Sequence, residues 1–441
     1  MKKSSPMPKN VLIMGLGKTG KSAANFFAGM GIKTVGYDQN ENCSLSGLPR
    51  EMNIVLGRPP NVSSFDLVVP SPGIHPKTYT KARRVLGDIE LSFRELNVPI
   101  IAVTGTNGKS TTVKLITDLL CSLGLRAKAG GNFGVPALSL LADDLDFAVL
   151  EVSSFQLETV EHFRPSVGIL LNLSEDHLDR HGTFQNYARM KARIFHKQTK
   201  NDIAITSVDD RLCDRLAQEG DAVQLRFGKK EIYSSLNIPN SYMRDHKLNI
   251  SGQNFSDKFE ISKKFTEIIP IENFLASALA LESLGISARN AFDKLGDFDP
   301  LPHRRTRTQL GNGVEIIDDS KATNPAAAKT AIELTRGPLI WIAGGRDKGT
   351  DFSDLALVAQ TRAREAILYG EAAEKIGSAL KDKISYVIVN DFEKAVAVAC
   401  SRAERGDSIL LAPACSSFDQ FQNFEQRGQS FKKVAESVAI L

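Results

Sequence analysis

Short apolar segments alternate with amphipathic, helix-like segments along almost the whole chain, and this alternation constrains the fold more than any other feature. A strand, a helix and the next strand, in this order, form the unit from which helix-covered parallel sheets are built. The 441 residues are enough for about three domains of ordinary size. The pattern therefore predicts an α/β protein with several parallel sheets.

Three blocks follow from the positions of the motifs. We expect a Rossmann-like N-terminal domain over residues 1–97, a central P-loop domain with a mainly parallel sheet over residues 98–302, and a C-terminal Rossmann-like α/β domain over residues 303–441. The polar region 225–261 shows little periodicity, so we expect irregular excursions or a small side sheet there.

Composition excludes several classes of protein. Hydrophobic residues make up 42% and charged residues 24% of the chain, as in globular proteins and unlike disordered or fibrous ones. The net charge of +4 is too small and too dispersed for a nucleic-acid surface. Five cysteines without paired spacing, no signal-peptide pattern and no apolar run of membrane-spanning length predict a cytoplasmic protein.

A glycine-rich turn follows the first apolar strand. Gly15, Gly17 and Gly20 form the pattern G-x-G-x-x-G between a strand and a helix, and Asp38 follows at the end of the next strand. Glycines let the backbone approach phosphates, a helix N-terminus attracts anions, and the acid can bond a ribose. The motif predicts a site for a nucleotide diphosphate. The alternative is a tight turn without a ligand, as found in any doubly wound domain.

A second glycine turn, Thr104–Thr111, also stands between an apolar strand and a helix. The strict Walker pattern would need glycine where this chain has Val103, but the shorter G-x-x-G-K-S is present. Its backbone amides can hold phosphates, Lys109 can reach the β- and γ-phosphates, and the Ser110 hydroxyl can hold Mg²⁺.

Acidic and polar side chains stand at the ends of two further strands. Glu151 ends an apolar run and, beside the second glycine turn, is a candidate ligand for the same Mg²⁺. The strand Val167–Leu171 is followed by a cluster at the kind of strand end where α/β proteins place chemistry. Its members are Asn172, Glu175, Asp176, His177, Asp179 and His181. A solvated loop explains His181 equally well and His177 less well.

A helix predicted over Phe184–Lys197 places a lysine on its apolar face. Apolar residues recur at i+3, i+4, i+10 and i+11 from Phe184, and Lys191 occupies i+7, whereas Arg189, Arg193 and Lys197 fall on the opposite face. A buried, unpaired ammonium tends to lose its proton, and the neutral amine can then be modified or do chemistry. The alternative is a lysine that snorkels from the edge of the stripe, and helical geometry does not choose between the two.

Three polar loops follow three strands of the last block. Residues 318–325 include Lys321 and end at Pro325, a suitable first residue for a helix with Asn324 as its N-cap. The other two loops are residues 344–349 and 412–421. Loops at neighbouring strand ends can form one rim, and lysines there suit a small anionic ligand. For each loop taken alone, ordinary turn and cap chemistry is the alternative.

Taken together, these motifs resemble those of the Mur ligases, in particular of their D-glutamate-adding branch. The resemblance runs along essentially the whole chain and rests on GLGKTG at 15–20, SPGI at 71–74, TGTNGKST at 104–111, GNFG at 131–134, EVSSFQLE at 151–158, NLSEDHLDRH at 172–181, LPHR at 301–304, DDSKATNP at 318–325, GGRDKG at 344–349 and PACSSFDQFQNFEQRG at 413–428. The glycine turn without the Walker glycine is a trait that Mur ligases share with folylpolyglutamate synthases.

The resemblance implies a monomeric, ADP-forming ligase of peptidoglycan precursor synthesis that acts on small molecules, without nucleic acid or membrane insertion. ATP would phosphorylate the carboxylate of UDP-N-acetylmuramoyl-L-alanine, and the amine of D-glutamate would displace phosphate from this acyl phosphate. Lys109, His177 and Lys191 would be the catalytic residues. Ser110 and Glu151 would hold one Mg²⁺, and His177 and a carbamate on Lys191 would hold a second, because carbamylation turns a misplaced cation into a carboxylate.

The resemblance also implies which residues contact each substrate. Those for ATP would be Gly105, Thr106, Asn107, Gly108, Lys109, Ser110, Thr111, Asn273, Arg304 and Asp319. Those for the UDP-linked substrate would be Gly17, Lys18, Thr19, Asp38, Ser71, Pro72, Gly73, Asn132 and His177. Those for D-glutamate would be Lys321, Thr323, Lys348, Ser417 and Phe424.

Three other functions remain open from the sequence. A nicotinamide-dependent oxidoreductase would use the first glycine motif but would leave Lys109, Glu151 and Lys191 unexplained. A nonenzymatic nucleotide-binding switch or scaffold would bind ATP without turnover stimulated by an amino acid. Within the Mur ligases, the acceptor would be another amino acid such as L-alanine or a diamino acid, which only the resemblance of the pocket residues opposes.

Overall fold

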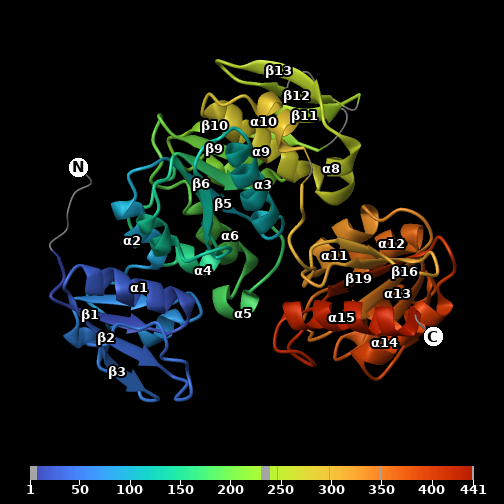
Figure 1. Ribbon diagram of the computed structural model, residues 1–441, viewed down its shortest axis with the longest axis horizontal. Helices are drawn as coiled ribbons and strands as arrows, with labels where there is room; N and C mark the ends of the chain where they lie inside the picture. Colours follow the sequence, from blue (N-terminus) through green and yellow to red (C-terminus); the bar gives the residue numbers. More distant parts are fainter. Residues whose placement is uncertain (1–6, 230–238, 246, 297, 348, 440–441) are drawn as a thin grey trace. The chain divides into compact units, whose positions relative to one another are not determined.

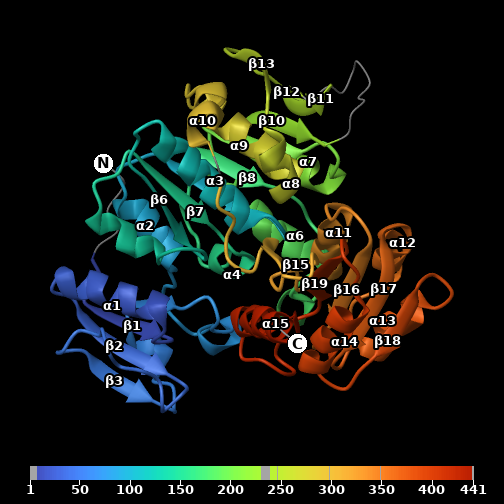
Figure 2. The same ribbon diagram turned by 45° about the vertical axis from the view of Figure 1, so that its right-hand side comes forward.

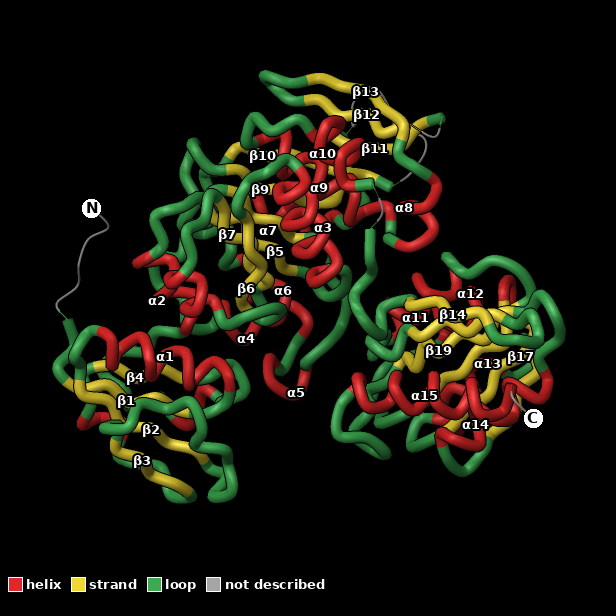
Figure 3. Tube along the Cα trace, in the orientation of Figure 1, coloured by secondary structure: helices red, strands yellow, loops and turns green. Residues whose placement is uncertain are grey.

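The computed structural model describes residues 7–229, 239–245, 247–296, 298–347 and 349–439. Within these residues the strands form three sheets, of four, nine and six strands, each packed against helices (Figure 1, Figure 3). The predicted α/β class with three sheet-containing domains is confirmed, whereas the predicted limits of the domains stay predictions. Among the same residues, no helix is long and apolar enough to span a membrane.

Contacts between residues group these elements into two compact units. The first unit contains the N-terminal and central sheets, and the second contains the C-terminal sheet together with α8 (Lys263–Ile268). The sites predicted around the two glycine turns therefore lie in the first unit, and the three polar loops of the last block lie in the second.

The N-terminal sheet is parallel and has the strand order β3-β2-β1-β4. Its strands are β1 (Asn10–Met14), β2 (Lys33–Asp38), β3 (Asn53–Leu56) and β4 (Leu67–Pro70). Helix α1 (Lys18–Gly29) packs on one face through Ala23, Ala24 and Phe27, and the segment from η1 (Val62–Ser64) to η2 (Pro76–Thr78) contributes to the other face. Because β1 has β2 on one side and β4 on the other, the carboxyl ends of β1 and β4 are the topological switch point of this sheet, where open α/β sheets bind ligands.

The central sheet has the order β13-β12-β11-β10-β9-β8-β5-β7-β6, and all of its pairs are parallel except those of β12 with β11 and β13. Its strands are β5 (Ile100–Thr104), β6 (Ala127–Gly131), β7 (Phe147–Glu151), β8 (Val167–Leu170), β9 (Ile203–Ser207), β10 (Val223–Gly228), β11 (Ser241–Arg244), β12 (Lys247–Ser251) and β13 (Ser256–Glu260). The mainly parallel sheet predicted for this domain is confirmed.

The polar region 225–261 is more regular than predicted. Residues 230–238 and 246 lie outside the described residues, but the rest forms strands that extend the central sheet at one edge instead of a separate side sheet. The signal in the sequence is weak because these edge strands bury only a few apolar side chains, such as Leu248, Ile250 and Phe259.

Helices cover both faces of the central sheet (Figure 1). One face carries α3 (Lys109–Ser122), α9 (Ile271–Ser283) and α10 (Ala288–Leu295). The other face carries α2 (Asp88–Glu95), η3 (Ala137–Ala142), α4 (Ser154–Leu157), α6 (Phe184–Ala192) and α7 (Arg211–Ala217), and the short α5 (Leu178–His181) packs against α6.

The helix that carries Lys191 is shorter than predicted. Helix α6 ends at Ala192, and the turns that follow keep Ile194 and Phe195 in the core. Arg193, which the helical pattern predicted on the opposite face, is half-buried and donates hydrogen bonds to two backbone carbonyl oxygens. The helical wheel fails there because the helix has already ended.

The C-terminal sheet has the order β14-β15-β19-β16-β17-β18 and is parallel except for β14. Its strands are β14 (Thr306–Gln309), β15 (Glu315–Asp318), β16 (Leu339–Gly344), β17 (Ala363–Tyr369), β18 (Ser385–Ile388) and β19 (Ser408–Ala414). Figure 2 shows this sheet among its helices: α11 (Pro325–Glu333), α12 (Ser353–Arg362) and α13 (Ala373–Leu380) pack on one face, and α14 (Phe392–Arg402) and α15 (Phe424–Ala439) pack on the other. As predicted, the Asn324 side chain caps α11.

Candidate active site

The first glycine turn follows β1 and lies against the loop after β4. Gly15 has a φ of +86°, and a Cβ there would come within 2.9 Å of the Ser71 side chain. A Cβ at Gly20 would lie only 1.8 Å from the carbonyl oxygen of Gly15. In contrast, Gly17 and Gly73 have open space where a Cβ would be. Two glycines therefore shape the turn, and two leave the backbone accessible to a ligand such as a phosphate.

Asp38 supports this turn from the end of β2. Its carboxylate accepts hydrogen bonds from the backbone amides of Leu16 (2.8 Å) and Asn40 (2.9 Å). The Ser71 hydroxyl donates to the carbonyl oxygen of Gly15 at 2.9 Å. Each carboxylate oxygen still has a second lone pair, so the predicted contact of Asp38 with a ribose stays possible in this geometry. Lys18 and Thr19 lie at the start of α1 beside the turn.

The second glycine turn joins β5 to α3 and is held by the loop after the neighbouring strand β8. The backbone amide of Thr106 donates to the carbonyl oxygen of Asn172 (3.0 Å), and the amide of Asn107 donates to the Asn172 side chain (2.9 Å). The Lys109 ammonium folds over the turn and donates to the carbonyl oxygens of Gly105 and Thr106, at 2.9 Å each. A phosphate bound by this turn would therefore meet a lysine that is already in place.

Ser110, Glu151 and Asn132 form a compact polar group at the ends of β5, β7 and β6. The Ser110 hydroxyl donates to the carboxylate of Glu151, and the Asn132 amide donates to the other carboxylate oxygen at 2.6 Å. Glu151 is only 2% exposed. The sheet order β5-β7-β6 brings these residues together although they are far apart in the sequence. A hydroxyl and a carboxylate in this relation are oxygen donors of the kind that Mg²⁺ prefers.

Lys191 is in the interior of the protein, so the structure decides the question that the helical pattern left open. The side chain is 2% exposed, and its ammonium lies 2.8 Å from the carbonyl oxygen of Gly105, 3.4 Å from the Thr104 hydroxyl and 4.8 Å from the centre of the Tyr187 ring. Burial, and secondly the charge of Lys109, lower the pKa of Lys191 well below its ordinary value. The neutral amine is the form that acts as a nucleophile.

His177 lies beside this region in the loop after β8. Its backbone is left-handed, with a φ of +53°, and its ring packs edge-on against Phe155 with centroids 4.8 Å apart. Its Nε2 lies 3.7 Å from a carboxylate oxygen of Asp176. The described part of the chain contains no group of three or more His, Cys, Asp or Glu side chains that could hold a metal ion.

Tyr187 is a site residue that the sequence reasoning missed. Its hydroxyl lies 3.1 Å from the Thr106 hydroxyl in the second glycine turn, and its ring is 5.5 Å from the ring of His181. In the sequence it contributes to the apolar stripe of α6, so it was counted as core. The hydroxyl is the only signal in the sequence, because a buried tyrosine usually finds a hydrogen-bond partner for it.

Asn273, on α9, lies directly beneath the second glycine turn. A Cβ at Gly108 would come within 2.7 Å of the amide oxygen of Asn273, and Gly108 has a φ of +85°. Asn273 is 1% exposed, and among the described residues neither atom of its amide group has a hydrogen-bond partner. Because buried polar groups are nearly always paired in folded proteins, this amide is suited to receive a ligand.

The polar loops of the second unit meet at the ends of β15, β19 and β16, which are neighbours in the sheet. The Lys321 ammonium lies 3.9 Å from the centre of the Phe424 ring, and the Ser320 hydroxyl donates to the carbonyl oxygen of Phe424 at 2.9 Å. Thr323 is in the same loop as Lys321, and Ser417 is buried in the loop after β19. Lys348, predicted for this pocket, lies outside the described residues.

Arg427 joins two of these loops and was not anticipated from the sequence. It is fully buried on α15 and donates to the carbonyl oxygens of Ser320 (2.9 Å) and Cys415 (3.1 Å) and to the Ser320 hydroxyl (3.0 Å). An arginine in a helix is normally read as exposed, so periodicity alone does not reveal this role.

Arg304 and Asp319 also lie in the second unit. They directly follow His303 and Asp318 in the sequence, and the Nδ1 of His303 lies 2.6 Å from a carboxylate oxygen of Asp318. Loss of water around Asp319 raises the pKa of its carboxyl to about 6. Of the residues predicted for ATP, those in the second glycine turn and on α3 and α9 are thus together in the first unit, and Arg304 and Asp319 belong to the second.

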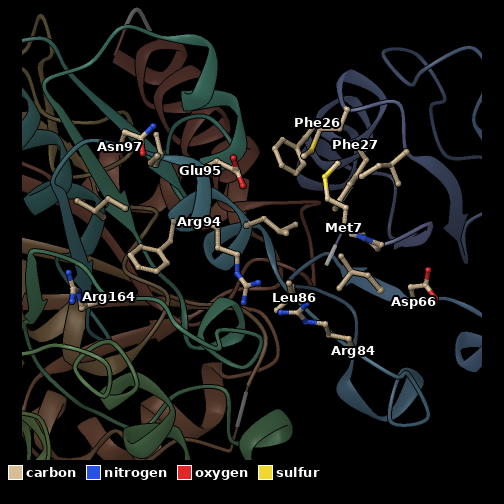
Figure 4. A pocket seen from close by; sticks show the side chains of 18 of the residues that line it. Met7, Phe26, Phe27, Asp66, Arg84, Leu86, Arg94, Glu95, Asn97 and Arg164 are labelled. Atoms are coloured by element: carbon tan, nitrogen blue, oxygen red, sulfur yellow. The ribbon is translucent and has the colours of Figure 1, made fainter. Parts of the chain in front are cut away.

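A cavity of about 1270 Å³ lies elsewhere in the first unit, near the amino-terminal ends of the strands (Figure 4). Its lining includes Phe26 and Phe27 of α1, with Arg84 and Arg94 on another side. Both arginines form ion pairs with Glu161, at 2.9 and 2.6 Å. The glycine turns stand at the carboxyl ends of the strands, so this cavity is separate from the site built around them.

Three segments of the chain match known domain families. Residues 9–90 match the Mur ligase MurD-like N-terminal domain, residues 103–281 the Mur ligase middle domain, and residues 303–415 the Mur ligase glutamate ligase domain.

Similarity to individual proteins extends over nearly the whole chain. A protein of Geobacter metallireducens named UDP-N-acetylmuramoylalanine–D-glutamate ligase is 35% identical over 98% of both chains, and one of the same name from Acidobacterium capsulatum is 36% identical over 96% of this chain and 95% of its own. The crystal structure of MurF ligase from Thermotoga maritima in complex with ADP covers 92% of this chain and 95% of its own, with a TM-score of 0.63 and 18% identity, which shows the shared fold. The chain therefore belongs to the Mur ligase family.

Proposed function

We propose that the protein joins D-glutamate to UDP-N-acetylmuramoyl-L-alanine with the hydrolysis of ATP to ADP and phosphate, in peptidoglycan precursor synthesis. The observation that carries this proposal is the similarity along nearly the whole chain to relatives that bear the name of this ligase. The geometry of the site supports it, because this reaction uses two separate glycine turns and a buried lysine with a lowered pKa, whereas an oxidoreductase would use only the first turn. We expect the enzyme to be a cytoplasmic monomer.

The first step transfers the γ-phosphoryl group of ATP to the carboxylate of the muramoyl-alanine arm. A carboxylate oxygen forms the new bond to phosphorus, and the bond to the β-phosphate oxygen of ADP breaks. Such a transfer depends mainly on positioning and on neutralising charge. The amides of Gly105–Ser110 and the Lys109 ammonium suit the phosphates. The buried amide of Asn273, which has no hydrogen-bond partner among the described residues, suits the nucleotide. Gly17, Ser71 and Gly73 would hold the UDP end.

Magnesium fits the residues present. Ser110 and Glu151 already meet through a hydrogen bond and supply two oxygen donors, and a phosphate and water would complete the shell of one ion. His177 and Lys191 would serve a second ion if the amine of Lys191 carried a carbamate, and burial of this lysine supports that modification because CO₂ adds to a neutral amine. Bound Mg²⁺ would neutralise charge on the transferring phosphoryl group.

The second step forms the amide. The amine of D-glutamate attacks the acyl carbon, the bond from this carbon to the phosphate oxygen breaks, and the amine loses a proton. D-Glutamate carries two carboxylates, and the loops of the second unit offer Lys321, Thr323 and Ser417 for them, with Lys321 over the ring of Phe424. Lys348, which the sequence also assigns to this pocket, lies outside the described residues. Asp319 and Arg304 would face ATP.

Phosphate release tests this function directly. The purified full-length chain is supplied with ATP, Mg²⁺ and UDP-N-acetylmuramoyl-L-alanine, and D-glutamate is compared with L-glutamate, L-alanine and a diamino acid. We expect release that depends on both the UDP-linked substrate and D-glutamate. If another amino acid stimulates phosphate release as strongly as D-glutamate or more strongly, the proposed specificity for D-glutamate is wrong. A folded protein that shows no amino-acid-dependent release would refute the ligase assignment.

A further inference from the structure

Arg180, on the short helix α5, connects the two halves of the first unit, and none of the roles assigned above uses it. Its guanidinium forms a two-point ion pair with Glu158, with Nε–Oε1 and Nη2–Oε2 distances of 2.9 and 2.6 Å. The same Nη2 donates to the carbonyl oxygen of Ile74 at 3.0 Å. The side chain of Arg180 is 8% exposed and that of Glu158 is 9% exposed.

One end of this connection is the turn that holds the predicted diphosphate site. Ile74 closes the turn, because its backbone amide donates to the carbonyl oxygen of Ser71 at 2.9 Å. Ser71 in turn binds the carbonyl oxygen of Gly15, in the first glycine turn. If the Ile74 carbonyl group moved, the turn Ser71–Ile74 would move with it, and so would the first glycine turn at Gly15, which we expect to bind the UDP end of the substrate.

The other end is the aromatic group beside the second glycine turn. The Arg180 guanidinium lies 4.2 Å from the centre of the Phe155 ring, and Phe155 packs against His177 at 4.8 Å. His181 lies 5.7 Å from Phe155 and 5.5 Å from Tyr187, whose hydroxyl contacts Thr106. Arg180 also donates its own backbone amide to the carbonyl oxygen of His177 at 3.1 Å.

We propose that Arg180 is a positioning residue that sets the distance between the loop for the UDP end of the substrate and the group of His177, Tyr187 and the second glycine turn. This inference rests on the proposed function. The substrate spans both loops, so its carboxylate reaches the γ-phosphate only if the two loops keep their separation. The planar guanidinium binds Glu158 and the Ile74 carbonyl group at once and stacks on Phe155, which a lysine cannot do.

The test couples a substitution to a truncation of the substrate. Arg180→Lys keeps a charge for Glu158 but loses the geometry. With UDP-N-acetylmuramoyl-L-alanine we expect kcat/KM to fall about tenfold to hundredfold, the range for losing a hydrogen bond to a charged group. With N-acetylmuramoyl-L-alanine, which lacks the whole UDP anchor including both phosphates, we expect a fall of less than about threefold, because binding energy from a remote anchor then no longer depends on the loop spacing.

If Arg180 has a merely structural role, kcat/KM falls by the same factor for both substrates, and this result would overturn the proposal. An unchanged kcat/KM for the full substrate would also overturn it. If wild-type enzyme turns over the truncated substrate too slowly to measure, kcat at saturating full substrate decides, together with Tm: a fall of about tenfold or more at an unchanged Tm supports the proposal, whereas an unchanged kcat, or a fall matched by a lower Tm, overturns it. Inactive wild-type enzyme would instead refute the proposed function.

Two further variants separate folding from positioning. The double variant Arg180→Gln with Glu158→Gln leaves no unpaired buried charge, so it is expected to fold and to show the same loss as Arg180→Lys. The matched control is Arg189→Ala, which removes an exposed arginine from the adjacent helix α6. We expect this variant to have unchanged kcat/KM for both substrates. If the double variant folds and keeps wild-type kinetics, Arg180 has no positioning role.

Discussion

Asp88 gives the sharpest quantitative prediction of stability, because it is a carboxyl group placed almost completely in the interior. It is the first residue of α2 and is 1% exposed. The side-chain amide of Gln156 is its nearest side-chain donor, at 3.3 and 3.4 Å from the two carboxylate oxygens, which is long for a hydrogen bond. Burial outweighs this donor and raises the pKa of Asp88 to about 6.

The sign follows from the direction of the shift. A carboxyl whose pKa is raised from 3.8 to about 6 binds its proton more tightly in the folded state, so the free energy of unfolding falls as the pH rises from about 4 to about 6. A rise of about two pKa units means that the ionised Asp88 side chain lowers the free energy of unfolding by about 3 kcal/mol at neutral pH. Asp88→Asn removes this cost but loses about 1 kcal/mol of acceptor strength. We therefore expect the variant to be about 2 kcal/mol more stable at pH 8.

Thermal melting followed by scanning calorimetry measures this difference. For a unit of this size, 2 kcal/mol corresponds to roughly 4 °C in Tm. The gain should shrink between pH 7 and pH 5, because wild-type Asp88 becomes protonated over that interval. Glu95→Gln is the matched control on the same helix, and no pH-dependent difference is expected because Glu95 is exposed. A gain that is equal at pH 5 and pH 8, or a less stable variant at pH 8, would refute the reasoning.

Three other substitutions test the site and its support. Lys191→Ala should nearly abolish D-glutamate-dependent phosphate release, and a short carboxylic acid should partly restore it; wild-type activity would remove Lys191 from the mechanism. Gly108→Ala should weaken ATP binding about tenfold or more, measured by calorimetric titration, because its Cβ would press on Asn273 at a φ of +85°; unchanged affinity with a normal Tm contradicts this. Glu90→Gln should lower the free energy of unfolding, measured with denaturant, by about 3–5 kcal/mol. The fully buried carboxylate of Glu90 forms an ion pair with an arginine and accepts hydrogen bonds from three backbone amides. The control Glu95→Gln should change the free energy of unfolding by less than about 0.5 kcal/mol.

Much of the fold could be predicted from patterns of residues close together in the sequence. Each glycine turn stands between an apolar strand and a helix, and these short-range signals predicted the strands and the turns. Asn324 and Pro325 identified the start of α11 in the same way. The prediction failed where the signal was weak, as in the edge strands around Leu248 and Phe259, or where a helix ended early, as before Arg193.

The sequence by itself determined the α/β class, the places of the two glycine turns and the presence of one lysine on an apolar face, since these depend on spacing along the chain. Only the tertiary structure decided that Lys191 is buried, that Glu151 meets Ser110 and Asn132, and that Arg180 reaches Ile74. The reason is physical: strand order and domain contacts bring together residues that are distant in sequence, and burial, which sets the protonation state of a side chain, depends on everything packed around it.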